Sequence, residues 1–239
     1  MTKYKISAVS YTNTLPFIYG LKKSEIINSI DLSLDIPSDC ADKLISGQVD
    51  IGLVPVAVLP EVQNYNIISD YCIGATGAVN SVFIFSDKPI EEIKTLRLDS
   101  QSRTSNLLAK ILLENYWKVL PEIVEGNQDA FVEIGDRTFG KKEKYRFAYD
   151  LAEVWKSFTG LPFVFAVWAA NKPINSKFIS DFNSALRLGL DSRDEVLKTL
   201  PEKAGFDLED YLLRRVDYIF NETKKEALEL FLRLAKGLE

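Results

Sequence analysis

The sequence predicts an α/β protein of two lobes, each built on a mixed, mainly parallel sheet. Short strands alternate with helices along most of the 239 residues, a pattern typical of parallel sheets with helices on both faces. The alternation restarts after Asp87-Lys88-Pro89, which marks a second lobe. The run 163–170, FVFAVWAA, is apolar without a polar alternation. Both faces of such a strand must be covered, so we expect a buried strand here.

The restart near residue 87 and a return near residue 168 divide the chain. We expect residues 1–85 and 169–239 to form the first lobe and residues 86–168 the second. Segments 81–85 and 163–169 would cross between the lobes, with a ligand cleft between them. Clefts of this kind gather polar groups at the carboxyl ends of strands and the amino ends of helices.

The first half of the chain is expected to alternate strands with short helices. Pro16 opens a helix as a first-turn residue, and Pro55 opens another. Ser38 is the natural N-cap of a helix over 39–45 that Gly47 ends. The expected strands are 5–9, 32–36, 49–54, 67–73 and 81–85.

The second half begins with a strand at 95–98 and a helix at 103–116. Leu107, Leu108, Ile111 and Leu112 recur at helical spacing and define the inner face of that helix. The remaining expected strands are 130–134, 163–169 and 218–220. The remaining expected helices are 151–158, 175–190, 193–200, 208–214 and 222–238.

The composition excludes several classes of protein. Apolar residues make up 46% and charged residues 26%, which is typical of a globular protein. The net charge of -5 argues against binding to nucleic acid or to a membrane surface. Histidine is absent, which excludes imidazole metal sites and histidine bases. We expect no metal, no cofactor and no membrane span, because no apolar run approaches ~18 residues.

The cysteines and the first residues indicate a cytoplasmic protein. Cys40 and Cys72 lie far apart in apolar segments, and we expect two buried free thiols. The segment MTKYKISAVSYTNTLPF has no long apolar stretch and no small-residue cleavage site. It is therefore expected to form a first strand and not a signal peptide.

The strongest local signal is Ser102-Arg103-Thr104-Ser105, which follows a strand and begins a helix. Three hydroxyls and a guanidinium at the positive end of a helix dipole suit a carboxylate or a phosphate. A capped helix with an exposed arginine explains the same residues.

Other candidates lie at further strand ends. Ser10, Tyr11 and Asn13 follow the first strand, where the Asn13 amide could bind a ligand or cap the next helix. Asp136 could act as a general base, contact a ligand or cap a turn. Ser81 could contact a ligand, or it could be an ordinary strand residue.

Together these segments resemble the chorismate dehydratase family, which performs the first committed step of the futalosine route to menaquinone. The resemblance runs in the order of the family from residue 6 to about residue 170. It implies a two-lobed type 2 periplasmic-binding-protein-like fold, in agreement with the division above. The segments that carry it are VSYTNTLPFIYGL, GAVNSVFIFS, SQSRTSNLLAKILL, IGD at 134–136 and VWKSFTGLPFVFAVWAA.

The sequence departs from the family at Thr12, where an apolar residue is usual, and at Ala78, where a proline is common. Neither change removes a polar contact. The sister enzyme of the same pathway has the same fold but relies on a histidine. Because this chain has none, the resemblance favours the dehydratase.

The resemblance implies a lyase that removes water from chorismate to give 3-[(1-carboxyvinyl)oxy]benzoate without a cofactor. It assigns Arg103 to a substrate carboxylate and Asn13 to the region of the departing hydroxyl. The proton acceptor is either Asp136 or a carboxylate of the substrate. A cytosolic small-anion-binding protein or sensor with the same fold is the alternative. The residues expected at the substrate are Ser10, Tyr11, Asn13, Ser81, Ser102, Arg103, Thr104, Ser105 and Asp136.

Overall fold

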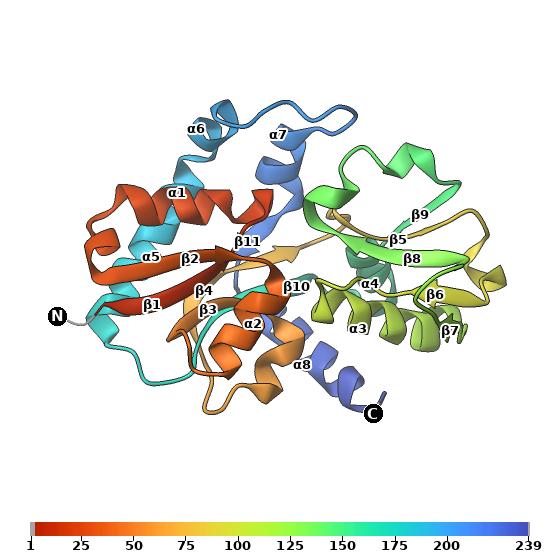
Figure 1. The fold of residues 1–239 in the computed structure, drawn as a ribbon, viewed down its shortest axis with the longest axis horizontal. Helices are drawn as coiled ribbons and strands as arrows, with labels where there is room; N and C mark the ends of the chain where they lie inside the picture. Colours follow the sequence, from red (N-terminus) through yellow and green to blue (C-terminus); the bar gives the residue numbers. More distant parts are fainter. Residues whose placement is uncertain (1–2, 239) are drawn as a thin grey trace. The chain divides into compact units, whose positions relative to one another are not determined.

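The computed structural model describes residues 3–238 and contains two compact units (Figure 1). The chain passes between the units several times. The first unit consists of Met1–Ile73, Phe165–Pro201 and Tyr218–Asn221. The second consists of Gly74–Val164, Glu202–Asp217 and Glu222–Glu239.

The sheet of the first unit is mixed and has six strands in the order β11-β4-β10-β3-β1-β2. β1 pairs in parallel with both β2 and β3, whereas β10 runs antiparallel to β3. The strands are β1 (Tyr4–Val9), β2 (Ile30–Asp35), β3 (Ile51–Pro55), β4 (Asn66–Ala75), β10 (Phe163–Ala170) and β11 (Asp217–Ile219).

The apolar run singled out in the sequence is strand β10, and all eight of its residues are buried. Trp168 is paired with Leu53 of β3. Its ring makes edge contacts with the rings of Phe17 and Phe182, 5.9 and 5.1 Å away between centroids. The prediction of a strand covered on both faces is therefore confirmed.

Two helices of the first unit pack with their backbones in contact. The helices of this unit are α1 (Leu15–Lys23), α2 (Pro37–Ile45), α5 (Ser176–Asp191) and α6 (Arg193–Lys198). A Cβ added to Gly20 of α1 would lie 1.9 Å from the carbonyl oxygen of Ala185 in α5. A Cβ added to Gly189 would lie 1.8 Å from the carbonyl oxygen of Pro16. Because backbone cannot retreat as a side chain can, only glycine fits at these two positions.

We expect Gly189→Ala to lower the free energy of unfolding by about 2–4 kcal/mol, because the new methyl group must push α1 away from α5. Urea unfolding of the purified variant measures this. Gly77→Ala is the matched control, since a Cβ at Gly77 would meet nothing within 4 Å. Equal stability of the two variants would contradict the close helix packing.

The sheet of the second unit has five strands in the order β7-β6-β8-β5-β9. β6 pairs in parallel with β7 and β8, and β5 is antiparallel to β8 and β9. Both sheets are thus mixed, and the α/β class is confirmed. The strands are β5 (Val82–Ser86), β6 (Thr95–Arg97), β7 (Glu122–Ile123), β8 (Ala130–Ile134) and β9 (Phe147–Asp150).

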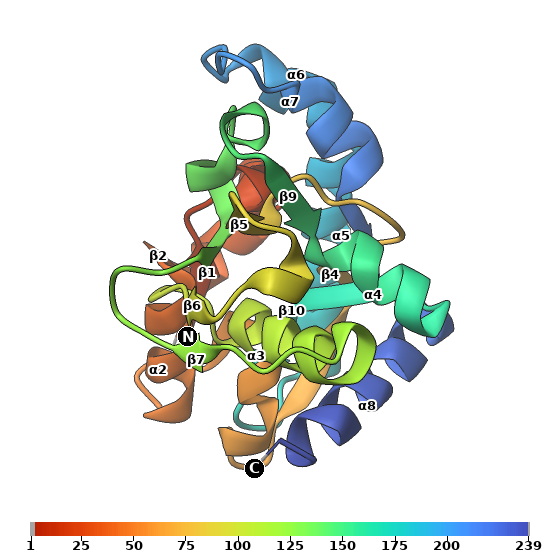
Figure 2. The same ribbon diagram turned by 90° about the vertical axis from the view of Figure 1, so that its right-hand side faces the viewer.

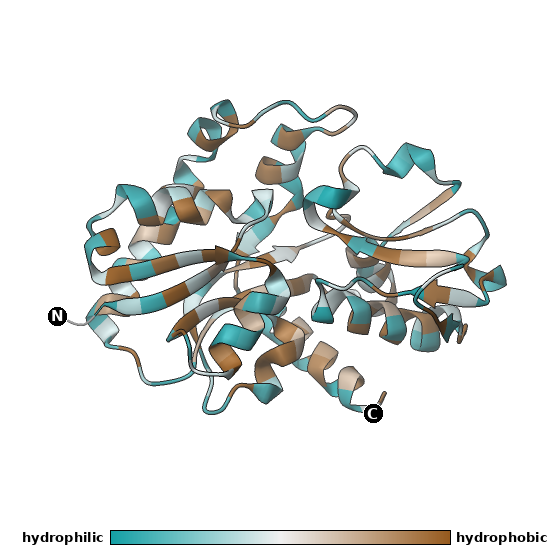
Figure 3. Cartoon of the chain, in the orientation of Figure 1, coloured by the Kyte–Doolittle hydropathy of each residue, from teal (hydrophilic) through white to brown (hydrophobic). Residues whose placement is uncertain are grey.

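Three helices pack together on the second unit. Its helices are α3 (Arg103–Leu112), α4 (Leu151–Thr159), α7 (Leu208–Asp210) and α8 (Glu222–Lys236). α3 contacts α4 and α8, and Figure 2 shows the three side by side. The ring of Phe231 in α8 packs edge-on against Trp155 and Phe163. Both hydrophobic and hydrophilic residues occur in α3 (Figure 3), and its buried residues include Leu108, Ile111 and Leu112, as expected of a helix with one buried face.

The units divide the chain differently from the expected bounds of 1–85 plus 169–239 and 86–168. Residues 74–85 belong to the second unit, as do the tail segments Glu202–Asp217 and Glu222–Glu239. The expectation that the tail returns as a whole to the first lobe is therefore wrong. In α8, Phe231 contacts Trp155 and Phe163, which are far away in the sequence, and no local pattern reveals these contacts.

Several expected element bounds need correction. Pro37 is the first residue of α2 and Ile36 its N-cap, so Ser38 is not the cap. The α-helix expected over 103–116 ends at Leu112 and continues as one π-turn, Leu113–Trp117, that stops at a left-handed Lys118. Strands β7 and β9 were not expected. β7 has only two residues and β9 follows a charged loop, so neither carries a clear pattern.

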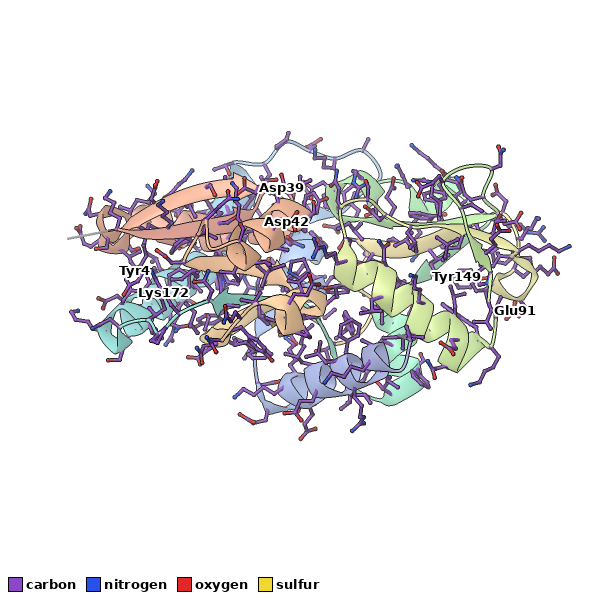
Figure 4. All side chains as sticks on the ribbon, turned by 60° about the horizontal axis from the view of Figure 1, so that its bottom comes forward. Tyr4, Asp39, Asp42, Glu91, Tyr149 and Lys172 are labelled. Carbon is purple, nitrogen blue, oxygen red and sulfur yellow. The ribbon has the colours of Figure 1, made fainter. Side chains whose placement is uncertain are left out.

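One tyrosine in each unit contacts a residue that is distant in the sequence. In the second unit the hydroxyl of Tyr149 accepts a hydrogen bond from the Ile90 N–H at 2.9 Å. Burial, together with the nearby charge of Glu91, raises the pKa of Tyr149 (Figure 4). In the first unit Lys172 lies beside Tyr4, with its Nζ 5.9 Å from the ring centre (Figure 4).

Among residues 3–238, no helix is both long and apolar enough to cross a membrane.

Candidate functional site

The turn after β1 is held in place by a hydrogen-bond network at the ends of two strands. The Ser10 N–H donates to the carbonyl oxygen of Asp35 at 2.9 Å. The Asp35 carboxylate accepts hydrogen bonds from Ser7, Ser33 and Lys43 at 2.6–2.7 Å. Burial opposes ionisation of this carboxyl, but the three donors outweigh it and lower its pKa. The backbone of Ser10 is therefore fixed at the carboxyl end of β1.

Asn13 occupies the middle of a 3-10 turn, Thr12–Thr14, and is half-buried. Its carbonyl oxygen accepts a hydrogen bond from the hydroxyl of Tyr218 at 2.9 Å. Its side-chain oxygen accepts one from the Thr14 hydroxyl at 3.3 Å. The N-cap of α1 is Thr14, so Asn13 does not cap that helix. The capping alternative is therefore excluded, and the ligand-binding role of Asn13 stays a prediction.

The start of α3 combines a helix cap with an arginine. Ser102 is the N-cap, and its hydroxyl accepts a hydrogen bond from the Ser105 N–H at 3.1 Å. Ser102, Thr104 and Ser105 are buried, whereas Arg103 is partly exposed. The capping interpretation is therefore right for Ser102. Arg103 supplies the positive charge at the amino end of the helix.

The loop before α3 is organised by Asp99, whose side chain is fully buried. Its carboxylate accepts hydrogen bonds from the Gln101 N–H at 2.8 Å and the Ile134 N–H at 3.1 Å. Nη2 of Arg137 lies 2.8 and 2.6 Å from the two carboxylate oxygens. The side-chain oxygen of Asn106 in α3 accepts a hydrogen bond from the Asp99 N–H, and its amide nitrogen donates one to the Asp99 carbonyl. These contacts connect the start of α3 to the end of β8.

Ser81 directly precedes β5, and Asp136 lies two residues after the end of β8, the strand that pairs with β5. The carbonyl oxygen of Ser81 accepts a hydrogen bond from the Gly135 N–H at 2.8 Å. Ser81 is only 1% exposed. Its hydroxyl accepts a hydrogen bond from the Tyr211 hydroxyl at 3.0 Å. Asp136 is the second residue of the 3-10 turn Gly135–Thr138, whose N-cap is Ile134. Asp136 is therefore not the cap of that turn.

The structure thus brings the sequence candidates together in two groups. In the second unit, Asp99 and Gly135 join the start of α3, Ser81 and Asp136 into one hydrogen-bonded region. Ser10, Tyr11 and Asn13 form the turn of the first unit. The sequence interpretation missed Asp99, Arg137 and Tyr211. Arg137 directly follows Asp136, and Asp99 lies two residues after the end of β6, so their positions in the sequence could have drawn attention to both.

Asp150 is a further buried carboxyl near Ser81 that sequence reasoning missed. It is the N-cap of α4 and accepts hydrogen bonds from the Ala152 and Glu153 N–H groups. It also accepts one from the N–H of Asn80 at 2.7 Å, a residue held at a φ of 59°. Burial raises the pKa of Asp150 to about 6, although these donors act in the opposite direction. An aspartate directly before an apolar helical pattern is the signal that could have revealed it.

This raised pKa predicts that the protein is stabilised by mild acid at this site. Folded protein binds a proton at Asp150 below about pH 6, whereas the unfolded chain does so only near 3.8. Stability therefore rises as the pH falls through this window, by about 1 kcal/mol between about pH 7 and 5. Urea unfolding of wild type and Asp150→Asn at both pH values isolates this contribution. An equal pH dependence in the two proteins would contradict the assignment.

The described residues offer hydrogen-bonding and carboxylate chemistry. Among residues 3–238, no three His, Cys, Asp or Glu side chains are placed to hold a metal ion. Cys40 and Cys72 are buried free thiols, as expected. Burial raises the pKa of Cys40 to about 12, which makes it a poor nucleophile.

Known proteins that are similar to this chain include two curated relatives and one solved structure. A chorismate dehydratase of Thermus thermophilus is 25% identical over 86% of this chain and 84% of its own length. A chorismate dehydratase of Campylobacter jejuni is 28% identical over 96% of both chains. The Candida albicans CA3427 gene product, described as having the generic periplasmic binding protein fold, aligns with a TM-score of 0.69. That alignment has 13% identity and covers 99% of this chain and 91% of the other.

These similarities confirm the periplasmic-binding-protein-like fold expected from the sequence. The expected family relationship is confirmed as well. A family model described as menaquinone biosynthesis matches residues 4–237, nearly the whole chain. The chain therefore belongs to this menaquinone biosynthesis family.

Proposed function

We propose that this protein is a chorismate dehydratase, a carbon–oxygen lyase that converts chorismate to 3-[(1-carboxyvinyl)oxy]benzoate. One observation carries the proposal: the match to the menaquinone biosynthesis family spans residues 4–237, and both curated relatives named above are chorismate dehydratases. The proposal includes the cytoplasmic setting expected from the cysteine usage.

Chorismate carries two carboxylates, and the chain has a net charge of -5. Binding therefore requires local positive charge, because the overall negative charge of the protein repels the substrate dianion. The start of α3 supplies it through Arg103 and the amino end of the helix dipole. The substrate contacts that belong to the proposal are those expected from the sequence: Ser10, Tyr11, Ser81, Ser102, Arg103, Thr104 and Ser105.

The reaction breaks two bonds of the substrate ring. The C3–H bond breaks, its electron pair forms the C3–C4 double bond, and the C4 hydroxyl leaves with a proton as water. Because the ring becomes aromatic, the enzyme needs mainly to position the substrate and stabilise charge. We assign Asn13 to the departing hydroxyl, since a neutral amide can both donate and accept there. The rigid turn around Asn13 supports this role, because two backbone contacts hold it independently of the side chain.

Two groups can accept the C3 proton: Asp136 and the enolpyruvyl carboxylate of chorismate. We assign the proton to the substrate carboxylate, because it is tethered beside C3 and benefits from proximity. Asp136→Asn should then retain turnover within about tenfold of wild type, measured as kcat across the pH range. A fall in kcat of about 10²-fold or more, together with disappearance of the low-pH limb of the curve of kcat against pH, would instead identify Asp136 as the base.

A small-anion-binding protein with the same fold would bind chorismate and release it unchanged. Incubation of the purified protein with chorismate, followed by ultraviolet absorbance, distinguishes the two functions. A dehydratase exchanges the diene absorbance for that of an aromatic ring, with many turnovers per protein. A spectrum that stays constant while calorimetry detects binding would favour the binding protein and overturn the proposal.

A further inference from the structure

We propose that Tyr218 is a positioning residue for the dehydration, because its hydroxyl holds the turn that carries Asn13. The inference rests on the proposed function, since it takes Asn13 to act on the departing hydroxyl of chorismate. Tyr218 was not among the site candidates of the sequence. It lies in the first unit, as Asn13 does.

The hydrogen-bond ladder of the turn stops at Asn13. In a 3-10 turn each carbonyl accepts a hydrogen bond from the N–H three residues further on. The Leu15 N–H is bonded to the Thr12 carbonyl in this way. The next carbonyl, that of Asn13, would need an N–H at Pro16, and proline has none. The Asn13 carbonyl is therefore open to a donor from elsewhere in the fold.

Tyr218 supplies that donor from strand β11. Its hydroxyl donates to the Asn13 carbonyl at 2.9 Å, and the residue is only 3% exposed. The ring packs edge-on against Phe17, with 5.3 Å between the centroids. The guanidinium of Arg193 lies over the same ring, 5.7 Å from its centre. These contacts hold the ring and thereby direct its hydroxyl at the turn.

The strand that carries Tyr218 is itself held on both sides of this residue. On one side the fully buried Lys224 donates from Nζ to the carbonyl of Asp217 at 2.7 Å and pairs with its carboxylate, also at 2.7 Å. On the other side the Phe220 N–H donates to the carbonyl of Asp70 at 2.8 Å. The Tyr218 hydroxyl is thus a fixed point against which the turn is placed.

Tyr218→Phe should lower kcat for chorismate dehydration about tenfold and leave KM within about twofold. The ring contacts with Phe17 and Arg193 remain, and only the hydrogen bond to the Asn13 carbonyl is lost. A shift of that carbonyl moves the Asn13 side chain as well. Displacement of a reacting group by about 1 Å can cost up to about 10²-fold in rate. The effect falls on kcat, because Asn13 is assigned to the transition state.

Tyr149→Phe is the matched control in the second unit. It removes the same oxygen and likewise one hydrogen bond to the backbone, the one from the Ile90 N–H at 2.9 Å. This variant should keep wild-type kcat and KM, and the two variants should unfold at similar urea concentrations. An equal fall of kcat in both variants would show a general loss of structure and would overturn the proposal.

The decisive variant is Asn13→Ala/Tyr218→Phe. If Tyr218 acts through Asn13, its kcat should lie within about twofold of that of Asn13→Ala alone. A further tenfold fall would overturn the proposal and show that Tyr218 acts on the substrate itself. Wild-type kcat in the single variant Tyr218→Phe would overturn it as well.

Nuclear magnetic resonance of ¹⁵N-labelled protein tests the positioning without turnover. The side-chain amide signal of Asn13 is identified as the one that is lost in Asn13→Ala. It should shift in Tyr218→Phe and stay in place in Tyr149→Phe. An unchanged signal in Tyr218→Phe would overturn the proposal. Failure of the proposed function is recognised separately, because wild-type protein would then leave chorismate unchanged although the signal shifts.

Discussion

Asn13→Ala should lower kcat for chorismate dehydration by about 10²–10³-fold while changing KM only a few fold. The amide is assigned to the departing hydroxyl, where charge develops in the transition state and not in the bound substrate. The substitution should leave the turn intact. The Tyr218 hydroxyl bonds the backbone carbonyl of Asn13, and the Thr14 N–H bonds the carbonyl of Tyr11, so neither contact depends on the amide.

Steady-state kinetics with purified protein measure this effect. Asn28→Ala is the matched control, because Asn28 lies in the first unit with an exposed side-chain contact to Glu25. That variant should keep wild-type kcat and KM. Near-wild-type turnover in Asn13→Ala would remove the centre of the proposed mechanism, whereas a large rise in KM alone would reassign Asn13 to substrate binding.

Arg103→Ala should weaken binding of chorismate by about one to two orders of magnitude, because a charge-assisted contact contributes roughly 1.5–3 kcal/mol. The helix start should survive the change. Ser102 caps α3 through the Ser105 N–H, and Asp99 and Asn106 fix the preceding loop without Arg103.

Calorimetry with the product dianion measures the loss without turnover. Lys110→Ala removes an exposed positive charge from the last turn of the same helix and serves as the control for net charge. It should bind nearly as wild type does. If Arg103→Ala and Lys110→Ala bind the dianion equally well, the anion site is not at the start of α3.

The strands and helices were predictable where a local pattern was strong. The unbroken apolar run of β10, the Pro16 helix start and strand β8 all follow from hydrophobic periodicity and first-turn chemistry. The N-cap at Ser38 was misplaced because Pro37 fits the first helical position better. The packing of α8 was not predictable, since Phe231 contacts Trp155 across more than seventy positions that carry no shared pattern.

The residues of the candidate site were also predictable only where a local pattern marks them. Ser102 and Arg103 were visible because a serine cap and an arginine precede a helical repeat. Asp99, Arg137 and Tyr211 were not, because their roles depend on partners far away in the chain. The Tyr211 hydroxyl reaches Ser81 across 130 positions, and Arg137 reaches Asp99 across 38. A position at the end of a strand identifies a candidate site residue. Only the fold shows which other side chains hold that residue in place.

The most direct test of the proposed activity follows the atoms of the substrate. Chorismate carrying deuterium at ring C3 is incubated with the purified protein, and the product is analysed by mass spectrometry. The proposal predicts an aromatic product that has lost one water together with the deuterium, at a rate that depends on Asn13. Recovery of chorismate unchanged, or of a product that retains the C3 deuterium, would contradict it.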